Sequence, residues 1–339
     1  MNDYPIILGI ESSCDDTGAA VIQNNKILSN IIANQKVHQN YGGVVPELAS
    51  RAHQKNIVPV IDEALKQAGI KKNRLSAIAY TRGPGLMGSL LVGSSFAKSL
   101  SLALDIPLIE INHMQGHILA HFIEDANNKP PEFPFLCLTV SGGHTQIVKV
   151  SNYFEMEVLG ETIDDAAGEA FDKSGKILGL DYPAGPIIDK LAKEGNPKKF
   201  TFSKPKVEGL NFSFSGLKTA ILYFIQKETK VNPNFIQENL VDLCASIQYT
   251  IVEILIKKLN LAVKQTGIKN VAIAGGVSAN SEIRKRLKEM ETIDNWTVFI
   301  PKFEYTTDNA AMIAMVGQLK FEKEQFTEIT TQSVSKYTI

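Results

Sequence analysis

The feature that most constrains the fold is a short apolar strand, a polar turn and a second strand, a pattern that occurs twice along the chain. The first copy spans residues 6–22 and the second spans residues 135–150. Short runs of branched apolar residues bounded by polar, turn-forming residues are typical of β-hairpins. The sequence therefore predicts two related halves, each organised around one hairpin.

Helical and strand-like segments alternate around these hairpins. Residues 46–68 and 89–104 have helical patterns, whereas residues 77–81 and 107–111 have the apolar character of strands. This alternation indicates an α/β fold. A polar segment with three prolines, residues 125–134, separates the halves. We expect an N-terminal lobe at residues 1–130, a C-terminal lobe at 131–317 with a helical insert at about 200–265, and a weakly docked tail at 318–339.

Composition limits how the chain can bind a nucleic acid. Lys and Arg number 35 and Asp and Glu number 36, so the formal net charge is −1 and a polyanion must be held by local basic patches. Two basic clusters could contact phosphates, although such runs are usually solvated faces. They are Lys193, Lys198, Lys199, Lys204 and Lys206, and Arg284, Lys285, Arg286 and Lys288.

The sequence also predicts a cytoplasmic protein with no membrane association. No apolar run approaches the roughly 18 residues of a membrane span, and the start, MNDYPIILGIESS, does not have the basic residues of a signal peptide. The three cysteines are far apart and in no metal-binding spacing, which suits a reducing compartment.

Three polar loops leave the ends of apolar strands. Residues 11–17 and 141–143 form hairpin turns, and residues 275–280 (GGVSAN) join a strand to a helix. Glycines let a ligand approach the backbone and a helix start favours an anion, although glycines in such turns often serve packing alone. Two hairpin phosphate loops and a Gly-Gly loop in duplicated lobes resemble the plan of the actin, heat-shock ATPase and sugar-kinase superfamily, whose two lobes flank a central cleft.

A pair of histidines suggests a metal site. His113 and His117 are four residues apart, so on a helix they lie on one face. Met114 occupies the position where a zinc protease has its general-base Glu. Asp308 is a candidate third ligand, and the alternative is that it only caps a late helix, as the histidines could be unrelated surface or capping residues. Two imidazoles and a carboxylate suit Fe(II), with Zn and Mn as rivals.

Residues 160–173 carry an acidic cluster. Asp165, Glu169 and Asp172 are spaced by four and three, which places them on one helix face, and Asp164 precedes them. This density calls for a cation, a hydroxyl or an ammonium partner. The alternative is that the carboxylates only complement the helix dipole.

Nine motifs, in order along about residues 6–317, give the chain a family resemblance. They read LGIESSCDDTGAAV, YGGVVPELASRAH, TRGPGL, HMQGH, TVSGGHTQ, ETIDDAAGEAFDK, NFSFSGLKTA, AGGVSAN and TDNAAMIA. The chain resembles the bacterial branch of the tRNA N6-adenosine threonylcarbamoyltransferase family. The resemblance implies an actin-like double fold and transfer of a threonylcarbamoyl group from threonylcarbamoyl-AMP to the N6 amine of the adenosine beside the anticodon, in tRNAs that read codons beginning with A.

The resemblance also implies a metal, partners and site residues. The metal is of the iron type, Fe(2+), held by His113, His117 and Asp308, and the partners are a degenerate actin-like paralogue of the TsaB type and a P-loop ATPase of the TsaE type. The implied substrate-binding residues are Thr139, Val140, Ser141, Gly142, Gly143, Asp172, Gly185, Asp189 and Asn280. Ala184 stands where the family usually has a glycine, which adds a methyl group beside the expected nucleotide pocket.

Transfer from a mixed anhydride needs no nucleophile on the protein, because the adenylate already carries a good leaving group. Glu11, Asp15 and His144 are candidates to accept the amine proton, and the sequence does not choose among them. Two other readings stay open: a phosphotransferase on the same fold, and a metal-dependent protease or a scaffold without catalysis. Met114 in place of Glu weighs against the protease.

Overall fold

The two predicted hairpins lie within two five-stranded β-sheets that share one strand order. The computed structural model describes residues 4–35, 38, 41–124 and 129–339. Contacts divide the chain into unit 1 (Met1–Pro131 and Pro301–Ile339) and unit 2 (Glu132–Ile300). The duplicated α/β architecture expected from the sequence is therefore confirmed.

Unit 1 contains the sheet β3-β2-β1-β4-β5. β1 pairs antiparallel with β2 and parallel with β4, while β3 and β5 form the two edges. Because β1, β4 and β5 are parallel, their carboxyl ends meet at one edge of the sheet, where ligands bind in open α/β folds. The strands are β1 (Ile6–Glu11), β2 (Thr17–Gln23), β3 (Lys26–Ala33), β4 (Ala77–Gly83) and β5 (Leu108–Asn112).

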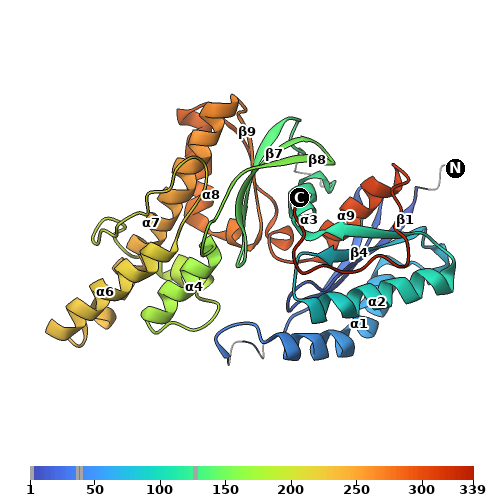
Figure 1. Ribbon diagram of the computed structural model, residues 1–339, viewed down its shortest axis with the longest axis horizontal. Coiled ribbons are helices and arrows are strands. Elements are labelled where there is room, and N and C mark those ends of the chain that lie inside the picture. Colours follow the sequence, from blue (N-terminus) through green and yellow to red (C-terminus); the bar gives the residue numbers. More distant parts are fainter. Residues whose placement is uncertain (1–3, 36–37, 39–40, 125–128) are drawn as a thin grey trace. The chain divides into compact units, whose positions relative to one another are not determined.

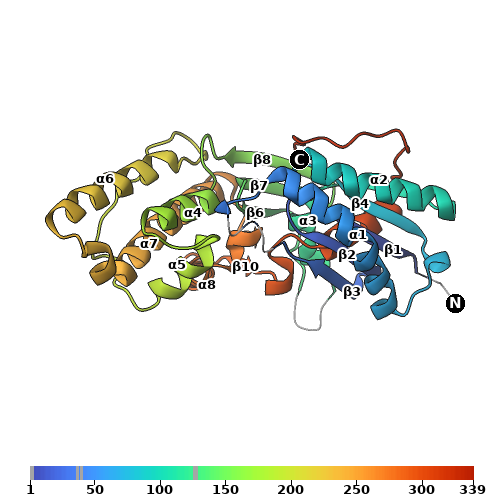
Figure 2. The same ribbon diagram turned by 90° about the horizontal axis from the view of Figure 1, so that it is seen from below.

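Helices cover both faces of this sheet, because successive residues of a strand point to opposite sides. Leu8 and Ile10 join a buried core with α1 (Pro46–Ala68) and α2 (Met87–Leu104). Gly9, between them, faces α9 (Ala310–Phe321), which lies on the opposite face (Figures 1 and 2). The other helices of the unit are α3 (His113–Leu119) and the short 3-10 helices η2 (Lys72–Arg74), η3 (Ala120–Phe122) and η5 (Phe303–Tyr305).

Helix α9 changes the expected division of the chain. Residues 301–317 belong to unit 1, whereas the sequence pattern placed them with residues 131–300. The physical reason is that α9 is apolar on all sides: every residue from Ala310 to Leu319 is buried. Such a helix has no solvent face and packs against the backbone of β1, β2 and β4.

Unit 2 repeats the sheet of unit 1, in the order β8-β7-β6-β9-β10. Again an antiparallel meander is followed by two parallel strands. One face carries Leu136, Leu138 and Val140 into a core shared with the helices of the unit. The strands are β6 (Phe135–Val140), β7 (Thr145–Asn152), β8 (Glu155–Glu161), β9 (Asn270–Ala274) and β10 (Thr297–Phe299).

The expected helical insert is part of the core of unit 2. It contains α6 (Ser215–Val231) and α7 (Phe235–Thr266), and α7 is buried along most of residues 243–263. Residues 201–214 precede α6 without forming a helix. Figures 1 and 2 show α6 at the end of unit 2 farthest from β7 and β8. The remaining helices are α4 (Ala167–Ile177), α5 (Ala184–Ala192), η4 (Gly276–Ala279) and α8 (Ser281–Ile293).

The tail docks more firmly than expected. Helix α9 continues to Phe321, and the following chain runs along β4 and β5. Thr327 N donates a hydrogen bond to Leu108 O at 2.8 Å, and Val334 N donates to Arg82 O at 3.0 Å. The expectation of weak docking was wrong because an extended segment held through its backbone needs no apolar periodicity.

Among the residues that the structure describes, two helices are long and apolar enough to cross a membrane by length and composition alone. In α2 33% of the apolar window is buried, and in α7 67% is buried. The sequence-based expectation that no run approaches this length was wrong. Helix α7 packs into the core of unit 2, and α2 packs on α1 and β4 with one face exposed.

We predict that Gly9→Ala destabilises unit 1. An added Cβ would lie 2.6 Å from Ala314 N and 2.7 Å from Ala310 O, so α9 would have to shift. Overpacking of this kind costs about 1–3 kcal/mol of unfolding free energy, measurable by urea titration. Gly143→Ala is the control, because no atom lies within 4 Å of its Cβ position. Equal stability of the two variants would contradict the close packing of α9.

Candidate functional site

Unit 1 brings the predicted metal ligands together. His113 Nε2 lies 3.3 Å and His117 Nε2 lies 3.2 Å from the same oxygen, Oδ1 of Asp308. The two rings are 4.7 Å apart and perpendicular. One potential ligand atom from each residue lies within 4.8 Å of the others.

Helix caps explain how this cluster forms. Asn112 Oδ1 accepts a hydrogen bond from Met114 N at 2.9 Å, so α3 begins at the first histidine and stacks the second one turn later. At α9 the cap is Asn309, whose Oδ1 accepts from Met312 N at 3.0 Å. The reading of Asp308 as the cap is therefore wrong, and its carboxylate is left to face the histidines.

Glu11 supports the cluster from the end of β1. Its Oε2 lies 3.1 Å from His113 Nδ1 and accepts a hydrogen bond from Thr81 Oγ1 at 2.6 Å. Its Oε1 accepts from Ser13 N. Glu11 is fully buried. A carboxylate on the far nitrogen of a ligating histidine fixes the tautomer and the ring orientation.

The charges of the cluster stabilise one another. Burial lowers the pKa of His113, but Asp308 and Glu11 outweigh burial and raise this pKa well above its ordinary value. Burial raises the pKa of Asp308, yet the two histidines hold it well below its usual range. The pKa of Glu11 is lowered in the same way, because His113 outweighs its burial. Both carboxylates are thus kept ionised beside a protonated His113, and a metal bound there would displace that proton.

The residues present fit a divalent metal. Two imidazole nitrogens and one carboxylate oxygen converge, which is a donor set that transition metals accept. The other ring nitrogen of His117, Nδ1, is buried and has no hydrogen-bond partner among the residues that the structure describes. Nε2 of this ring hydrogen-bonds to Asp308, so the ring is oriented by the site itself.

The hairpin loop of unit 2 presents an open backbone. Thr139 and Val140 are buried at the end of β6, so their side chains belong to the core. Ser141 O accepts a hydrogen bond from Gly168 N at 3.1 Å, which joins the loop to the start of α4. Gly142 and Gly143 are exposed, and nothing lies within 4 Å of either Cβ position. Of the predicted loop, the two glycines are the accessible part.

Asp172 and Gly185 lie at the start of α5. Asp172 Oδ1 accepts a hydrogen bond from Ala184 N at 2.8 Å, and burial raises the pKa of Asp172. The methyl group of Ala184 is buried against Gly175 in the contact between α4 and α5. Gly185 has room at its Cβ position, with Phe171 Cβ at 3.9 Å. The methyl group of Ala184 is therefore accommodated in the contact between α4 and α5.

Asp189 and Asn280 meet at the start of α8. Asn280 Oδ1 accepts from Glu282 N at 3.1 Å, and its Nδ2 donates to Gln248 at 2.8 Å. Asp189 Oδ1 accepts from Ser281 Oγ at 2.7 Å. Both predicted binding residues thus also hold the helix that follows the Gly-Gly loop.

The acidic cluster is neutralised within the chain. Lys173 Nζ contacts Asp165 at 2.6 Å and Glu169 at 2.7 Å, so the partner is an internal ammonium group. Asp164 accepts hydrogen bonds from Ser213 and from backbone groups at the start of α6. We expected the four carboxylates to lie in the first turns of one helix. This expectation is wrong, because α4 begins only at residue 167.

Sequence reasoning missed the residue that fastens the loop at residues 11–17. His53 is buried, its Nε2 donates to Cys14 O at 3.0 Å, and its Nδ1 accepts from Thr17 Oγ1 at 2.8 Å. Burial lowers the pKa of His53, which favours this neutral form. In the same loop burial raises the pKa of Asp16 to about 7, while Asn34 donates to it at 2.8 Å. The sequence signals for His53 were its place on the apolar face of α1 and its position at the end of the motif YGGVVPELASRAH.

The three candidate proton acceptors differ in their burial and in their hydrogen bonds. Glu11 is buried and engaged by His113, Thr81 and Ser13, so it positions a histidine. Asp15 is half-buried in the loop between β1 and β2. His144 is half-buried in the hairpin turn of unit 2, where its backbone N–H donates to Ser141 Oγ at 3.1 Å.

Comparison with known proteins identifies the family. The model of the tRNA N6-adenosine threonylcarbamoyltransferase family matches residues 26–315. The chain belongs to this family. A transferase of this name from Christiangramia forsetii is 69% identical over 99% of both chains. Those from Riemerella anatipestifer and Porphyromonas gingivalis are 65% and 58% identical, each over 98% of this chain and at least 97% of the relative.

Solved structures support the actin-like fold. Full-length HypF superposes with a TM-score of 0.61 at 14% identity, covering 96% of this chain and 48% of HypF. HypF from T. kodakarensis also gives 0.61, at 15% identity, covering 95% of this chain and 48% of that protein. The chain is thus a tRNA-modifying transferase built on a duplicated actin-like α/β fold.

We predict that Asp308→Asn removes the metal while α9 stays folded, because Asn309 supplies the cap. Loss of a charged ligand should weaken metal affinity by more than the roughly 10- to 100-fold that loss of a supporting group costs. The measurement is metal content by mass spectrometry after reconstitution with Fe(2+). Glu304→Gln is the matched control, because it removes a carboxylate charge from an exposed residue of η5. Full occupancy in the Asp308 variant would exclude it as a ligand.

Proposed function

We propose that the chain transfers the threonylcarbamoyl group of threonylcarbamoyl-AMP to the N6 amine of the adenosine adjacent to the anticodon, in tRNAs that read codons beginning with A. The observation that carries the proposal is family membership at 69% identity over 99% of the chain. The amine nitrogen forms a bond to the carbamoyl carbon, the anhydride C–O bond breaks, AMP leaves and the amine loses a proton. An unpaired adenosine in a loop costs less free energy to extrude into an active site than a base-paired one.

The loops of unit 2 support adenylate binding. Gly142 and Gly143 leave space beside the hairpin backbone, and Gly275 has φ +87°, a conformation that glycine adopts without strain. Gly275 also lies against Val140 O, so a side chain there would separate the two loops. The backbone N–H groups of the hairpin turn favour an anionic ligand, whereas those at the start of α8 already donate to Asp189 and Asn280. Asp172, Gly185, Asp189 and Asn280 hold the surrounding helix starts.

Fe(2+) is the metal we propose for unit 1, held by His113, His117 and Asp308. Two imidazoles and a carboxylate that leave further positions open suit Fe(II), and Zn and Mn are the rivals. A metal held there would supply a Lewis acid. The protein's own part is to orient His113 through Glu11 and to keep Asp308 ionised. Asp15 and His144 remain the candidates to accept the amine proton.

The proposal is tested with purified protein, threonylcarbamoyl-AMP and a tRNA transcript that carries the target adenosine. We expect threonylcarbamoyladenosine on nucleoside analysis and release of one AMP per modified base, and His117→Ala should abolish both. The same nucleoside should disappear from tRNA of cells depleted of the protein. Production of ADP and a phosphorylated small molecule would instead identify a phosphotransferase.

We also propose that the chain works in the cytoplasm with two protein partners, a degenerate paralogue of the TsaB type and a P-loop ATPase of the TsaE type. The outer face of α2 supports a protein partner on unit 1. Met87, Leu91 and Leu102 are 42%, 50% and 68% exposed along this one helix. Large exposed apolar side chains on one face commonly mark a protein interface.

We predict that Leu91→Asp prevents binding of the paralogue without unfolding the chain. A buried charge without a partner at an interface costs several kcal/mol of binding, whereas an exposed helix position tolerates the change. Tyr223→Asp on α6 is the control, since Tyr223 is a 66% exposed apolar residue of unit 2. Size-exclusion chromatography of mixed proteins reads out the complex. A normal complex with the Leu91 variant would remove α2 from the interface.

A further inference from the structure

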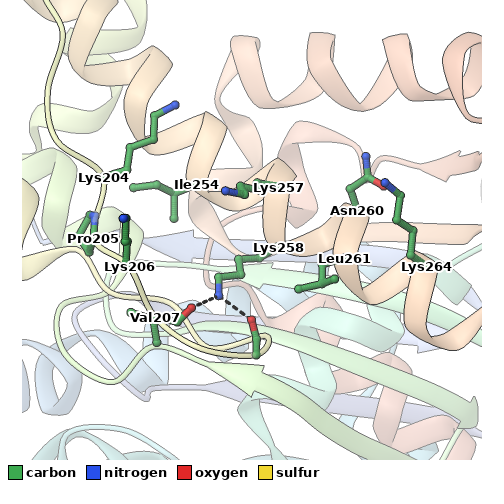
Figure 3. Close-up of a pocket in the computed structure, with 11 residues that line it drawn as sticks. Lys204, Pro205, Lys206, Val207, Ile254, Lys257, Lys258, Asn260, Leu261 and Lys264 are labelled. Atoms are coloured by element: carbon green, nitrogen blue, oxygen red, sulfur yellow. Dashed lines mark hydrogen bonds between the residues drawn. The ribbon is translucent and has the colours of Figure 1, made fainter.

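A basic groove lies in unit 2, apart from the loops described above. It has a cavity volume of about 590 Å³ and lies between residues 204–209 and helix α7 (Figure 3). Lysines line both sides, and the apolar side chains of Pro205, Val207, Ile254 and Leu261 lie among them. The lysines are Lys204, Lys206, Lys257, Lys258 and Lys264.

Lys258 holds the two walls together. Its Nζ donates hydrogen bonds to Val207 O at 2.7 Å and to Gly209 O at 2.6 Å, as Figure 3 shows. Two of its three N–H donors are thereby used inside the protein. The groove is thus a built feature of the fold, fixed by a side chain of α7 that clamps the backbone of the facing segment.

Besides Lys258, whose Nζ donates to carbonyl oxygens, three of the five lysines are left without a counter-charge. Lys204 pairs with Glu253 at 3.4 Å, but Lys206, Lys257 and Lys264 are exposed and have no carboxylate partner among the residues that the structure describes. Glu253 would be the natural i,i+4 partner of Lys257, yet it is held by Arg286 at 2.7 Å. Glu208 lies in the facing segment but does not line the groove.

The second predicted basic cluster differs in this respect. On α8, Lys285 pairs with Glu282 at 3.8 Å and Lys288 with Glu291 at 3.2 Å. Lys199, from the first cluster, pairs with Asp242 at 2.7 Å. Lys193 and Lys198 of the first cluster are exposed but do not line the groove. The groove gathers unpaired lysines from two segments, and two of them, Lys257 and Lys264, belong to α7 rather than to either cluster.

We propose that this groove binds the phosphate backbone of the tRNA substrate. Lys257 and Lys264 are seven residues apart, which is about 10.5 Å along a helix axis, so they reach separate phosphates of a polymer rather than one phosphate group. A near-neutral chain needs such a local patch to hold a polyanion, and the apolar floor can lie against ribose. The inference rests on the tRNA-modifying function proposed above.

The test compares two variants of the full-length chain, each lacking two lysines from one helix of unit 2. Lys257→Ala with Lys264→Ala removes unpaired groove lysines, and Lys285→Ala with Lys288→Ala removes paired lysines of α8. Binding of a substrate tRNA transcript is titrated at several salt concentrations. In the groove variant the slope of log affinity against log salt should fall by roughly 0.7 to 0.9 for each lost contact, and the α8 variant should keep the wild-type slope.

Two further readouts separate the groove from the rest of the function. Because phosphate contacts carry no base information, a tRNA without the target adenosine should lose affinity equally. At saturating tRNA the groove variant should form threonylcarbamoyladenosine at the wild-type rate, with only the KM for tRNA raised. Wild-type tRNA affinity and slope in the groove variant would overturn the inference while leaving the transferase function intact. The inference would also be overturned if the groove variant bound tRNA normally but no longer bound an acidic protein.

Discussion

The direct contact between helix α9 and strand β1 is the constraint on which the rest of unit 1 depends. Gly9 gives α9 access to the strand backbone, and Gly317 lies against Ala79 in the same way. Because α9 is anchored on β1, Asp308, two residues before the start of α9, lies against the histidines of α3. At the glycine between the two histidines, Gly116, an added Cβ would lie 3.2 Å from Ile313 Cδ1, so α3 and α9 are closely packed there. A metal site built from residues 191 positions apart follows from this backbone packing.

Unit 2 has the same sheet and, like α3 and α9 of unit 1, depends on side chains that cap or brace the helix starts. Asp172, Asp189 and Asn280 each accept backbone or side-chain hydrogen bonds at the start of a helix. These residues therefore fix where the N–H groups of each helix start point. A substitution at any of them would disturb the loop backbone, unlike a change at the open positions Gly142 and Gly143.

The sequence predicted what depends on local pattern and failed where distant contacts decide. The duplicated hairpins and the spacing of His113 and His117 are local, and the structure brings them out as expected. The place of residues 301–317 depends on a helix that is apolar all round, which has no amphipathic stripe to show its docking side. Likewise His53 and Lys173 are ordinary in sequence, and only the fold shows that one fastens a loop and the other neutralises a carboxylate pair.

Charge pairing shows why counting basic residues along a chain misplaces a binding surface. On α8 each carboxylate is three residues from its lysine, so the spacing in the sequence is enough to predict these ion pairs. On α7 the same spacing rule assigns Glu253 to Lys257, but Arg286 from the neighbouring helix takes that carboxylate at 2.7 Å. One tertiary ion pair thus leaves a cation free on a different helix. In a chain whose net charge is −1, where positive charge is left unpaired matters more than how many lysines a segment holds.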